Sequence, residues 1–310
     1  MRAASTREIP PLSVLDTLVA AALPVTPRFV VGRVARRYIA GETVDDAVAT
    51  VRTLNGAGAV ATVDVLGEFI TDFSQARETA AEYEAVLAAI EREKLRCNVS
   101  VKLTALGLLI DHAGCLDLVR SICERAKRQG GFVRIDMEDS PVTQRTLDMV
   151  RLLVSEGYPV GAVLQAYLRR TLDDAEELAA EGISVRICKG IYREPPEIAY
   201  QDPEEIRTSY RDCLQALLEG SGRVGIAKHD EVLVEFARLL VAKTRTPRER
   251  YEFQMLLGVR EWMRDELIKA GERVRIYVPF GSDWYGYSTR RLKENPKIAG
   301  HVFRAMLGFK

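Results

Sequence analysis

The chain has 310 residues, of which 47% are hydrophobic and 28% are charged. This balance is typical of a folded globular protein and excludes a disordered or collagen-like chain. Its 44 basic and 44 acidic side chains leave a net charge of zero, which excludes the basic field that binds nucleic acid without sequence specificity. We therefore expect no nucleic-acid partner.

The cysteines indicate a reducing compartment, and the hydropathy of the chain bears on membrane segments. The five cysteines are odd in number and form no C-x-x-C pair, so neither a disulfide framework nor a zinc knuckle is expected. With three histidines in the chain, we expect no metal site. The sequence contains no apolar run of membrane-spanning length, and we expect the N-terminal apolar patch at Leu18–Val25 to form a helix and not a signal peptide. These features favour a cytoplasmic protein.

Residues 1–56 are predicted to form an N-terminal helical arm, with a helix over Ile39–Asn55 and Thr43 as its N-cap. From residue 57 to 310, short β-branched runs alternate with longer amphipathic segments. The predicted strands are Ala59–Val65, Asn98–Leu103, Phe132–Met137, Val160–Gln165, Ser184–Cys188, Arg223–Ala227, Tyr251–Met255 and Arg273–Val278. The predicted helices among them are Glu68–Lys94, Ser140–Gly157, Thr171–Gly182, Pro203–Glu219, Asp230–Lys243 and Val259–Gly271.

Strict alternation of strands and helices predicts an α/β fold with a parallel sheet. Eight units favour a closed (β/α)8 TIM-like barrel over an open doubly wound sheet. We expect the barrel to be the catalytic domain, residues 57–310, with a final helix over its C-terminal mouth.

Polar residues close most of the predicted strands. In barrels of this class, reactive groups project from the C-terminal strand ends, so a ring of donors and acceptors there indicates a polar ligand. A salt bridge between Lys102 and Asp136 on neighbouring strands is an alternative, purely structural interpretation of that pair. Strand seven is mostly apolar, although Gln254 can reach inward. The polar residues at the other strand ends are Asp64, Lys102, Asp136, Glu138, Gln165, Tyr167, Arg186, Lys189, Tyr192, Lys228, His229, Asp230 and Tyr277.

The segment after Tyr277 predicts a helix that begins near Trp284. On a helix, residues three and four apart lie on one face, so Tyr287, Arg290 and Arg291 lie together and Glu294 extends that face. Two guanidinium groups beside an aromatic ring suit a carboxylate ligand. A solvated arginine pair over a packed tyrosine is the competing interpretation.

Seven runs occur in order along the chain: TVDVLGE, VSVKLTALG, RIDMEDS, VLQAYLRR, VRICKGIYRE, YEFQMLLG and RIYVPFGSDWYGYSTRRLKEN. Together they resemble the proline dehydrogenase family, flavoenzymes that oxidise L-proline to Δ1-pyrroline-5-carboxylate. The resemblance spans roughly Val60 to Asn295. It implies non-covalently bound FAD, hydride transfer to FAD N5, and a membrane quinone as electron acceptor. Any contact with the inner face of the cell membrane would then be peripheral.

The resemblance also implies roles for individual residues. The arginine pair would bind the proline carboxylate, and the tyrosines would pack on its ring. The residues implied at the substrate are Lys102, Asp136, Tyr192, Leu256, Tyr277, Tyr287, Arg290 and Arg291. The residues implied at FAD are Gln165, Arg186, Lys189, Gly190, His229 and Glu294. The chain departs from the family at Lys228, where threonine is common, and at Ile191, where a small residue is frequent.

Two other classes of protein are compatible with the motifs. Lys102 and Lys189 at strand ends also suit a Schiff-base aldolase, which borohydride would trap with its carbonyl substrate. A non-catalytic barrel that only binds a carboxylate would retain binding without reducing a flavin.

Overall fold

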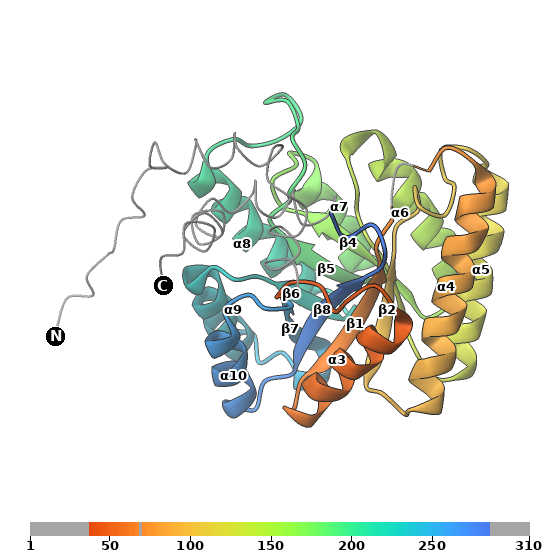
Figure 1. Cartoon of the computed structure of the whole chain (residues 1–310). Coiled ribbons are helices and arrows are strands. Elements are labelled where there is room, and N and C mark those ends of the chain that lie inside the picture. Colours follow the sequence, from red (N-terminus) through yellow and green to blue (C-terminus); the bar gives the residue numbers. More distant parts are fainter. Residues whose placement is uncertain (1–36, 68–69, 286–310) are drawn as a thin grey trace, which may run out of the picture. The chain divides into compact units, whose positions relative to one another are not determined.

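A computed structural model describes residues 37–67 and 70–285 of the chain. Its eight parallel strands close into a barrel, in which each strand pairs with the next and β8 pairs with β1 (Figure 1). This architecture confirms the predicted (β/α)8 TIM barrel. The strands are β1 Val60–Val65, β2 Cys97–Val101, β3 Val133–Ile135, β4 Val160–Gln165, β5 Ser184–Cys188, β6 Val224–Ala227, β7 Tyr251–Leu256 and β8 Val274–Phe280.

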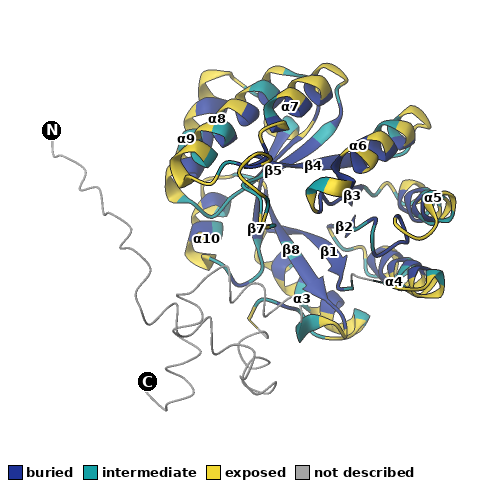
Figure 2. Ribbon diagram, turned by 90° about the horizontal axis from the view of Figure 1, so that it is seen from above, coloured by how far each residue is buried: buried dark blue, intermediate teal, exposed yellow. Residues whose placement is uncertain are grey.

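The helices surround the ring of strands, with buried inward faces and exposed outward faces (Figure 2). They are α3 Val44–Gly56, α4 Phe73–Arg92, α5 His112–Arg128, α6 Ser140–Ser155, α7 Thr171–Ala180, α8 Pro203–Glu219, α9 Glu231–Lys243 and α10 Glu261–Lys269, and a 3-10 turn, η2, covers Arg248–Arg250. No described helix is long and apolar enough to cross a membrane. The final helix, predicted to begin near Trp284 and to cover the mouth, falls outside the described residues from residue 286 onward.

Thr43 is the N-cap of α3, as predicted, but the helix begins at Val44 and not at Ile39. The Thr43 hydroxyl accepts a hydrogen bond from the Asp46 amide, and the Asp46 carboxylate accepts one from the Thr43 amide, which forms a capping box. The buried face of the helix includes Val51 and Leu54, and it packs against β1 and β8. Residues 1–36 of the predicted arm lie outside the described residues.

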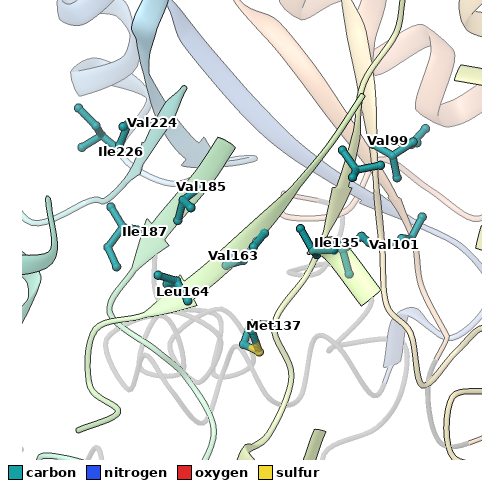
Figure 3. Packing of buried hydrophobic residues seen from close by; sticks show 14 of the residues in the cluster. Val99, Val101, Ile135, Met137, Val163, Leu164, Val185, Ile187, Val224 and Ile226 are labelled. Atoms are coloured by element: carbon teal, nitrogen blue, oxygen red, sulfur yellow. The ribbon is translucent and has the colours of Figure 1, made fainter. Parts of the chain in front are cut away.

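Aliphatic side chains on the strands form the layer between barrel and helices. Val99 and Val101 of β2, with Val185 and Ile187 of β5, are fully buried, and Figure 3 shows them on their strands. Side chains alternate between the two faces of a strand, so the residues between these valines and isoleucines face the barrel interior. Those interior positions carry polar and charged groups, which makes the interior the place to look for a site.

All five cysteines are free thiols. Cys97, Cys115 and Cys123 are buried, and burial raises the pKa of each thiol to about 12. Such thiols stay protonated at neutral pH and serve as small apolar packing groups.

Candidate active site

Asp136 is the central acceptor at the C-terminal mouth of the barrel. Its Oδ1 accepts hydrogen bonds from Ser100 Oγ at 2.6 Å and from Arg186 Nη1 at 2.7 Å. Its Oδ2 accepts a hydrogen bond from the Tyr277 hydroxyl at 2.7 Å. The three donors come from β2, β5 and β8, while Asp136 directly follows β3. Closure of the barrel therefore brings the predicted residues Asp136, Arg186 and Tyr277 together from three strands, with Ser100 from a fourth.

Lys102 forms the second ion pair of this mouth. Its Nζ lies 2.6 and 2.7 Å from the two oxygens of Asp64, but 3.9 Å from Asp136. The principal partner of Lys102 is thus Asp64, and Asp136 is secondary. Burial by itself would lower the pKa of Lys102, but Asp64 and Asp136 outweigh it and raise that pKa. The side chain is therefore an ammonium cation at neutral pH, and not the neutral amine that Schiff-base chemistry requires.

A chain of hydrogen bonds inside the barrel holds the Arg186 side chain in place. Its Nε donates to Gln254 Oε1 at 2.5 Å, and Gln254 Nε2 donates to Glu252 Oε1 at 2.7 Å. Glu252 in turn accepts from Arg275, and that pairing outweighs burial and holds the pKa of Glu252 at about 2. The Arg186 guanidinium also lies over the Tyr277 ring, 5.3 Å from its centroid. Ser100, Glu252 and Arg275 are site components that sequence reasoning missed.

Two more of the predicted substrate-pocket residues, Leu256 and Tyr192, end or follow strands at the same mouth. Leu256, half-buried, ends β7 in register with Tyr277. Tyr192 follows β5, and burial raises the pKa of its phenol, with a further contribution from the neighbouring carboxylates of Glu138 and Asp136. Leu256 and Tyr192 thus add an apolar side chain and a phenol to the mouth that holds Asp136.

Gln165 supports the loop between β5 and α8. Its Nε2 donates to the Glu138 carbonyl at 2.8 Å, and its Oε1 accepts from the Ile191 amide at 3.4 Å. Gly190 in the same loop has a φ of +109°, and a Cβ there would lie 2.0 Å from the Tyr167 ring. The backbone approaches Tyr167 so closely that only glycine fits.

A cationic cluster lies at the ends of β5 and β6. Lys189 Nζ and Arg207 Nε lie 2.9 and 3.0 Å from Asp230 Oδ2, and Lys228 is half-buried beside them. Burial, followed by the charge of Lys189, lowers the pKa of Lys228 to about 7. Nearby, His229 Nε2 accepts a hydrogen bond from the Leu256 amide at 2.9 Å. Lys189 and Arg207 thus share one carboxylate, with Lys228 beside them, which makes this part of the mouth a fit for an anionic group.

Replacing Lys228 with methionine is expected to stabilise the ligand-free protein below pH 7. The lysine pKa is about 7 in the folded chain and ordinarily 10.5, so the unfolded chain binds more protons between these values. The free-energy cost of burying the charged Lys228 is therefore largest below pH 7. It falls as the pH rises and is gone above about pH 10.5. Urea unfolding at pH 6.5, 8.5 and 10.5 should show a stabilisation that shrinks with pH. The exposed Lys243→Met is the control, and the same pH trend there would contradict the assignment.

Tyr287, Arg290, Arg291 and Glu294 lie outside the described residues, so their positions at the mouth stay predictions. Within residues 37–67 and 70–285, no group of three or more His, Cys, Asp or Glu side chains could hold a metal ion.

The described residues define a (β/α)8-barrel protein with a charged, hydrogen-bonded site at the C-terminal mouth, the position of the active site in barrel enzymes. A family model described as proline dehydrogenase matches residues 47–304. The chain belongs to the proline dehydrogenase family.

Individual relatives agree with this placement. Proline dehydrogenase 1 of Bacillus subtilis strain 168 is 36% identical over 273 residues, which cover 88% of this chain and 90% of the relative. Proline dehydrogenase of Deinococcus radiodurans is 35% identical over 278 residues, with the same coverage. The structure of proline utilization A from Bdellovibrio bacteriovorus, inactivated by N-propargylglycine, superposes with a TM-score of 0.80 at 28% identity over 85% of this chain. This chain covers 33% of that larger protein.

Proposed function

We propose that this chain oxidises L-proline to Δ1-pyrroline-5-carboxylate with non-covalently bound FAD. The observation that carries the proposal is the convergence of Arg186, Tyr277 and Lys102 around Asp136 at the barrel mouth. Membership of the proline dehydrogenase family and the names of the relatives support this choice of substrate.

The chain's own residues fit the proposed cofactor. FAD carries a pyrophosphate, and the cluster of Lys189, Lys228 and Arg207 has one more positive than negative charge when all its groups are ionised, because its carboxylates are Asp230 and Glu204. Gly190 follows Lys189 and lets the loop backbone pack against the Tyr167 ring beside this cluster. We therefore propose that Lys189, Gly190, His229 and Gln165 hold FAD, with Arg186 near its ring system and Glu294 as an additional support.

The pocket also fits the substrate. Proline has a carboxylate, an amine and an apolar ring. The Lys102 ammonium offers positive charge for the carboxylate, and Leu256 and Tyr277 offer surfaces for the ring. We propose that Tyr192 and Tyr287 complete the ring contacts and that Arg290 and Arg291 clamp the carboxylate.

When bound, FAD would supply the two-electron acceptor that takes hydride from the ring carbon next to the proline nitrogen. The protein's own task is to position groups. Asp136 fixes the Tyr277 hydroxyl and the Arg186 guanidinium at once, so neither needs to reorganise when substrate binds. Asp64 keeps the Lys102 charge in place at the pocket edge. The proline nitrogen then needs to be present as the free amine, whose lone pair assists the departure of hydride.

A visible absorption spectrum tests the function directly. The purified protein should be yellow, should release its flavin on denaturation, and should lose its flavin absorbance when L-proline is added without oxygen. A soluble quinone analogue should then restore the absorbance in a stopped-flow trace, as expected for a membrane quinone reached by peripheral contact. A colourless protein that neither takes up FAD nor is reduced by proline would reject the proposal. A covalent borohydride adduct with a carbonyl substrate would favour the aldolase.

Arg290→Ala and Arg291→Ala are each expected to raise KM for proline about 10- to 100-fold, because a charge-assisted hydrogen bond to the substrate carboxylate is lost. Steady-state kinetics with saturating quinone analogue measures the change. Arg238→Ala, on the outer surface of α9, serves as the control and should leave KM unchanged. An unchanged KM in both clamp variants would remove the arginine pair from the proposed site.

A further inference from the structure

The loop between β5 and α8, residues 189–202, lies at the C-terminal mouth of the barrel. Within the described part of the chain, none of its residues 191–198 is buried, and Ile191 and Ile198 are 46% and 38% exposed. The first buried side chain of the loop is Ala199. Burial of apolar surface therefore contributes little to the conformation of this loop, and hydrogen bonds to neighbouring segments have to hold it.

Glu194 ties this loop to the start of α6. Its Oε1 accepts a hydrogen bond from the Ser140 amide at 2.7 Å, and its Oε2 accepts one from the Ser140 hydroxyl at 2.8 Å. Asp139, the N-cap residue of α6, makes no side-chain cap hydrogen bond. The first amides of a helix need an acceptor, and the helix dipole favours a negative charge beside them. Glu194 thus caps α6 from a loop 54 residues further along the chain.

Tyr192 lies between this tether and a second one. On its N-terminal side, the Ile191 amide donates to Gln165 Oε1 at 3.4 Å, and Gln165 Nε2 donates to the Glu138 carbonyl at 2.8 Å. Burial, followed by the charge of the Glu138 carboxylate, raises the pKa of the Tyr192 phenol, so these two groups are neighbours. The loop therefore runs alongside the segment between β3 and α6, and the Glu194 tether comes two residues after this contact on both segments.

Glu194 is the stronger of the two tethers. Its carboxylate accepts two hydrogen bonds of normal length, whereas the bond from the Ile191 amide is long at 3.4 Å. Hydrogen bonds to an ionised group are also roughly twice as strong as neutral ones. Beyond Tyr192, Arg169 Nε donates to the Pro196 carbonyl at 2.8 Å, but this bond joins the loop to the segment between β4 and α7. The position of Tyr192 beside the segment between β3 and α6 therefore depends mainly on Glu194.

We propose that Glu194 is a positioning residue for the oxidation of proline, because its cap on α6 holds the Tyr192 phenol at the pocket. This inference rests on the proposed function, in which Tyr192 contacts the proline ring. Glu194 acts through Tyr192, since both of its carboxylate oxygens already bind Ser140. A loop that is ordered before proline arrives costs less free energy to order on binding. Loss of the tether should therefore weaken the binding of proline more than it slows the chemical step.

Steady-state kinetics of the flavin-containing protein tests this role. Glu194→Ala is expected to raise KM for proline about 5- to 20-fold and to change kcat by less than about threefold, because a binding contact is lost. Glu194→Gln should give a KM between these two proteins, since its amide keeps one oxygen acceptor without the charge. An unchanged KM in Glu194→Ala would overturn the proposal.

A double-variant cycle separates positioning from general support of the fold. In a Tyr192→Ala background, adding Glu194→Ala should change KM by less than about twofold, because the phenol to be positioned is gone. An equal rise of KM in both backgrounds would mean that Glu194 acts independently of Tyr192, and it would overturn the proposal.

Asp111→Ala is the matched control. Asp111 caps α5 by accepting from the Gly114 amide at 3.0 Å, and α5 has 17 residues where α6 has 16. The substitution should remove a comparable helix cap and leave KM within about twofold of the parent. A rise of KM as large as that of Glu194→Ala would attribute the effect to any lost cap, against the proposal.

Amide hydrogen exchange reports the position of the loop without turnover. Peptides of the flavin-containing protein that contain Ile191 or Ser140 should exchange at least about tenfold faster in Glu194→Ala than in the parent, and at the parent rate in Asp111→Ala. Unchanged exchange in Glu194→Ala would reject this inference and leave the proposed function intact. A parent protein whose flavin proline does not reduce would reject the proposed function and the inference together, so the two failures are distinguishable.

Discussion

Replacing Asp136 with alanine is expected to lower the free energy of unfolding by about 3–5 kcal/mol, the range for breaking a buried ion pair by removing one partner. Asp136 accepts hydrogen bonds from Ser100, Arg186 and Tyr277, and it also faces Lys102 at 3.9 Å. Without it, Arg186 is left as a buried cation whose remaining hydrogen-bond partners, Gln254 and Ser100, are neutral. Urea denaturation at pH 7 measures the loss.

Asp117→Ala is the control for this experiment. Asp117 is also paired with an arginine, Arg120, at 3.5 Å, but its side chain is 77% exposed, so the substitution should leave stability nearly unchanged. If the buried charge of Arg186 causes the loss, then adding Arg186→Met to Asp136→Ala should recover part of it. A double variant that loses the sum of both single effects would contradict the explanation.

Gly190→Ala is expected to destabilise the protein by about 2–6 kcal/mol, which combines overpacking with backbone strain. The added Cβ would lie 2.0 Å from Tyr167 Cδ1, and φ at this position is +109°. Tyr167 cannot easily move away, because its side chain is buried and its amide donates to the Lys189 carbonyl at 2.8 Å. The strain falls on the loop that we propose holds FAD, so the bound flavin per chain should fall as well.

Urea denaturation and the ratio of flavin to protein absorbance measure the two effects of Gly190→Ala. Gly56→Ala is the matched control, because Gly56 ends α3 with a φ outside the positive range, and a Cβ there meets no atom within 4 Å. It should be neutral or slightly stabilising, by up to about 1 kcal/mol. Equal stability of the two variants would show that the loop after β5 can shift to admit a side chain.

The sequence predicted the strands better than the helices. Strands β4 and β5 have the predicted bounds at both ends, and Pro159 precedes the first while Lys189 and Gly190 follow the second. Helix α5 went unrecognised, although Asp111 caps its start and its buried face, which includes Val119 and Ile122, recurs at helical spacing. Helix α4 begins at Phe73, after the cap formed by Asp72, so the predicted start at Glu68 was too early.

The predicted residues at the mouth were recognisable as strand-end polar groups, but their partners were not. Lys102 pairs chiefly with Asp64, at 2.6 Å, and not with Asp136, although β2 is a neighbour of both β1 and β3. The bond from Arg186 to Gln254 joins β5 to β7 across the interior, and these strands are not adjacent. Such contacts depend on the stagger of strands around the closed barrel, which a linear pattern does not specify.

The ladder between β1 and β8 joins residues more than two hundred positions apart, and the bond from Arg275 to the Ala61 carbonyl ties the same two strands together. During synthesis on the ribosome, β1 is therefore complete long before its final neighbour exists, and one side of it has no strand to pair with. Contacts between such distant positions slow folding and leave edges that attract other chains. The barrel of the nascent protein thus stays open until β8 has left the exit tunnel and pairs with β1.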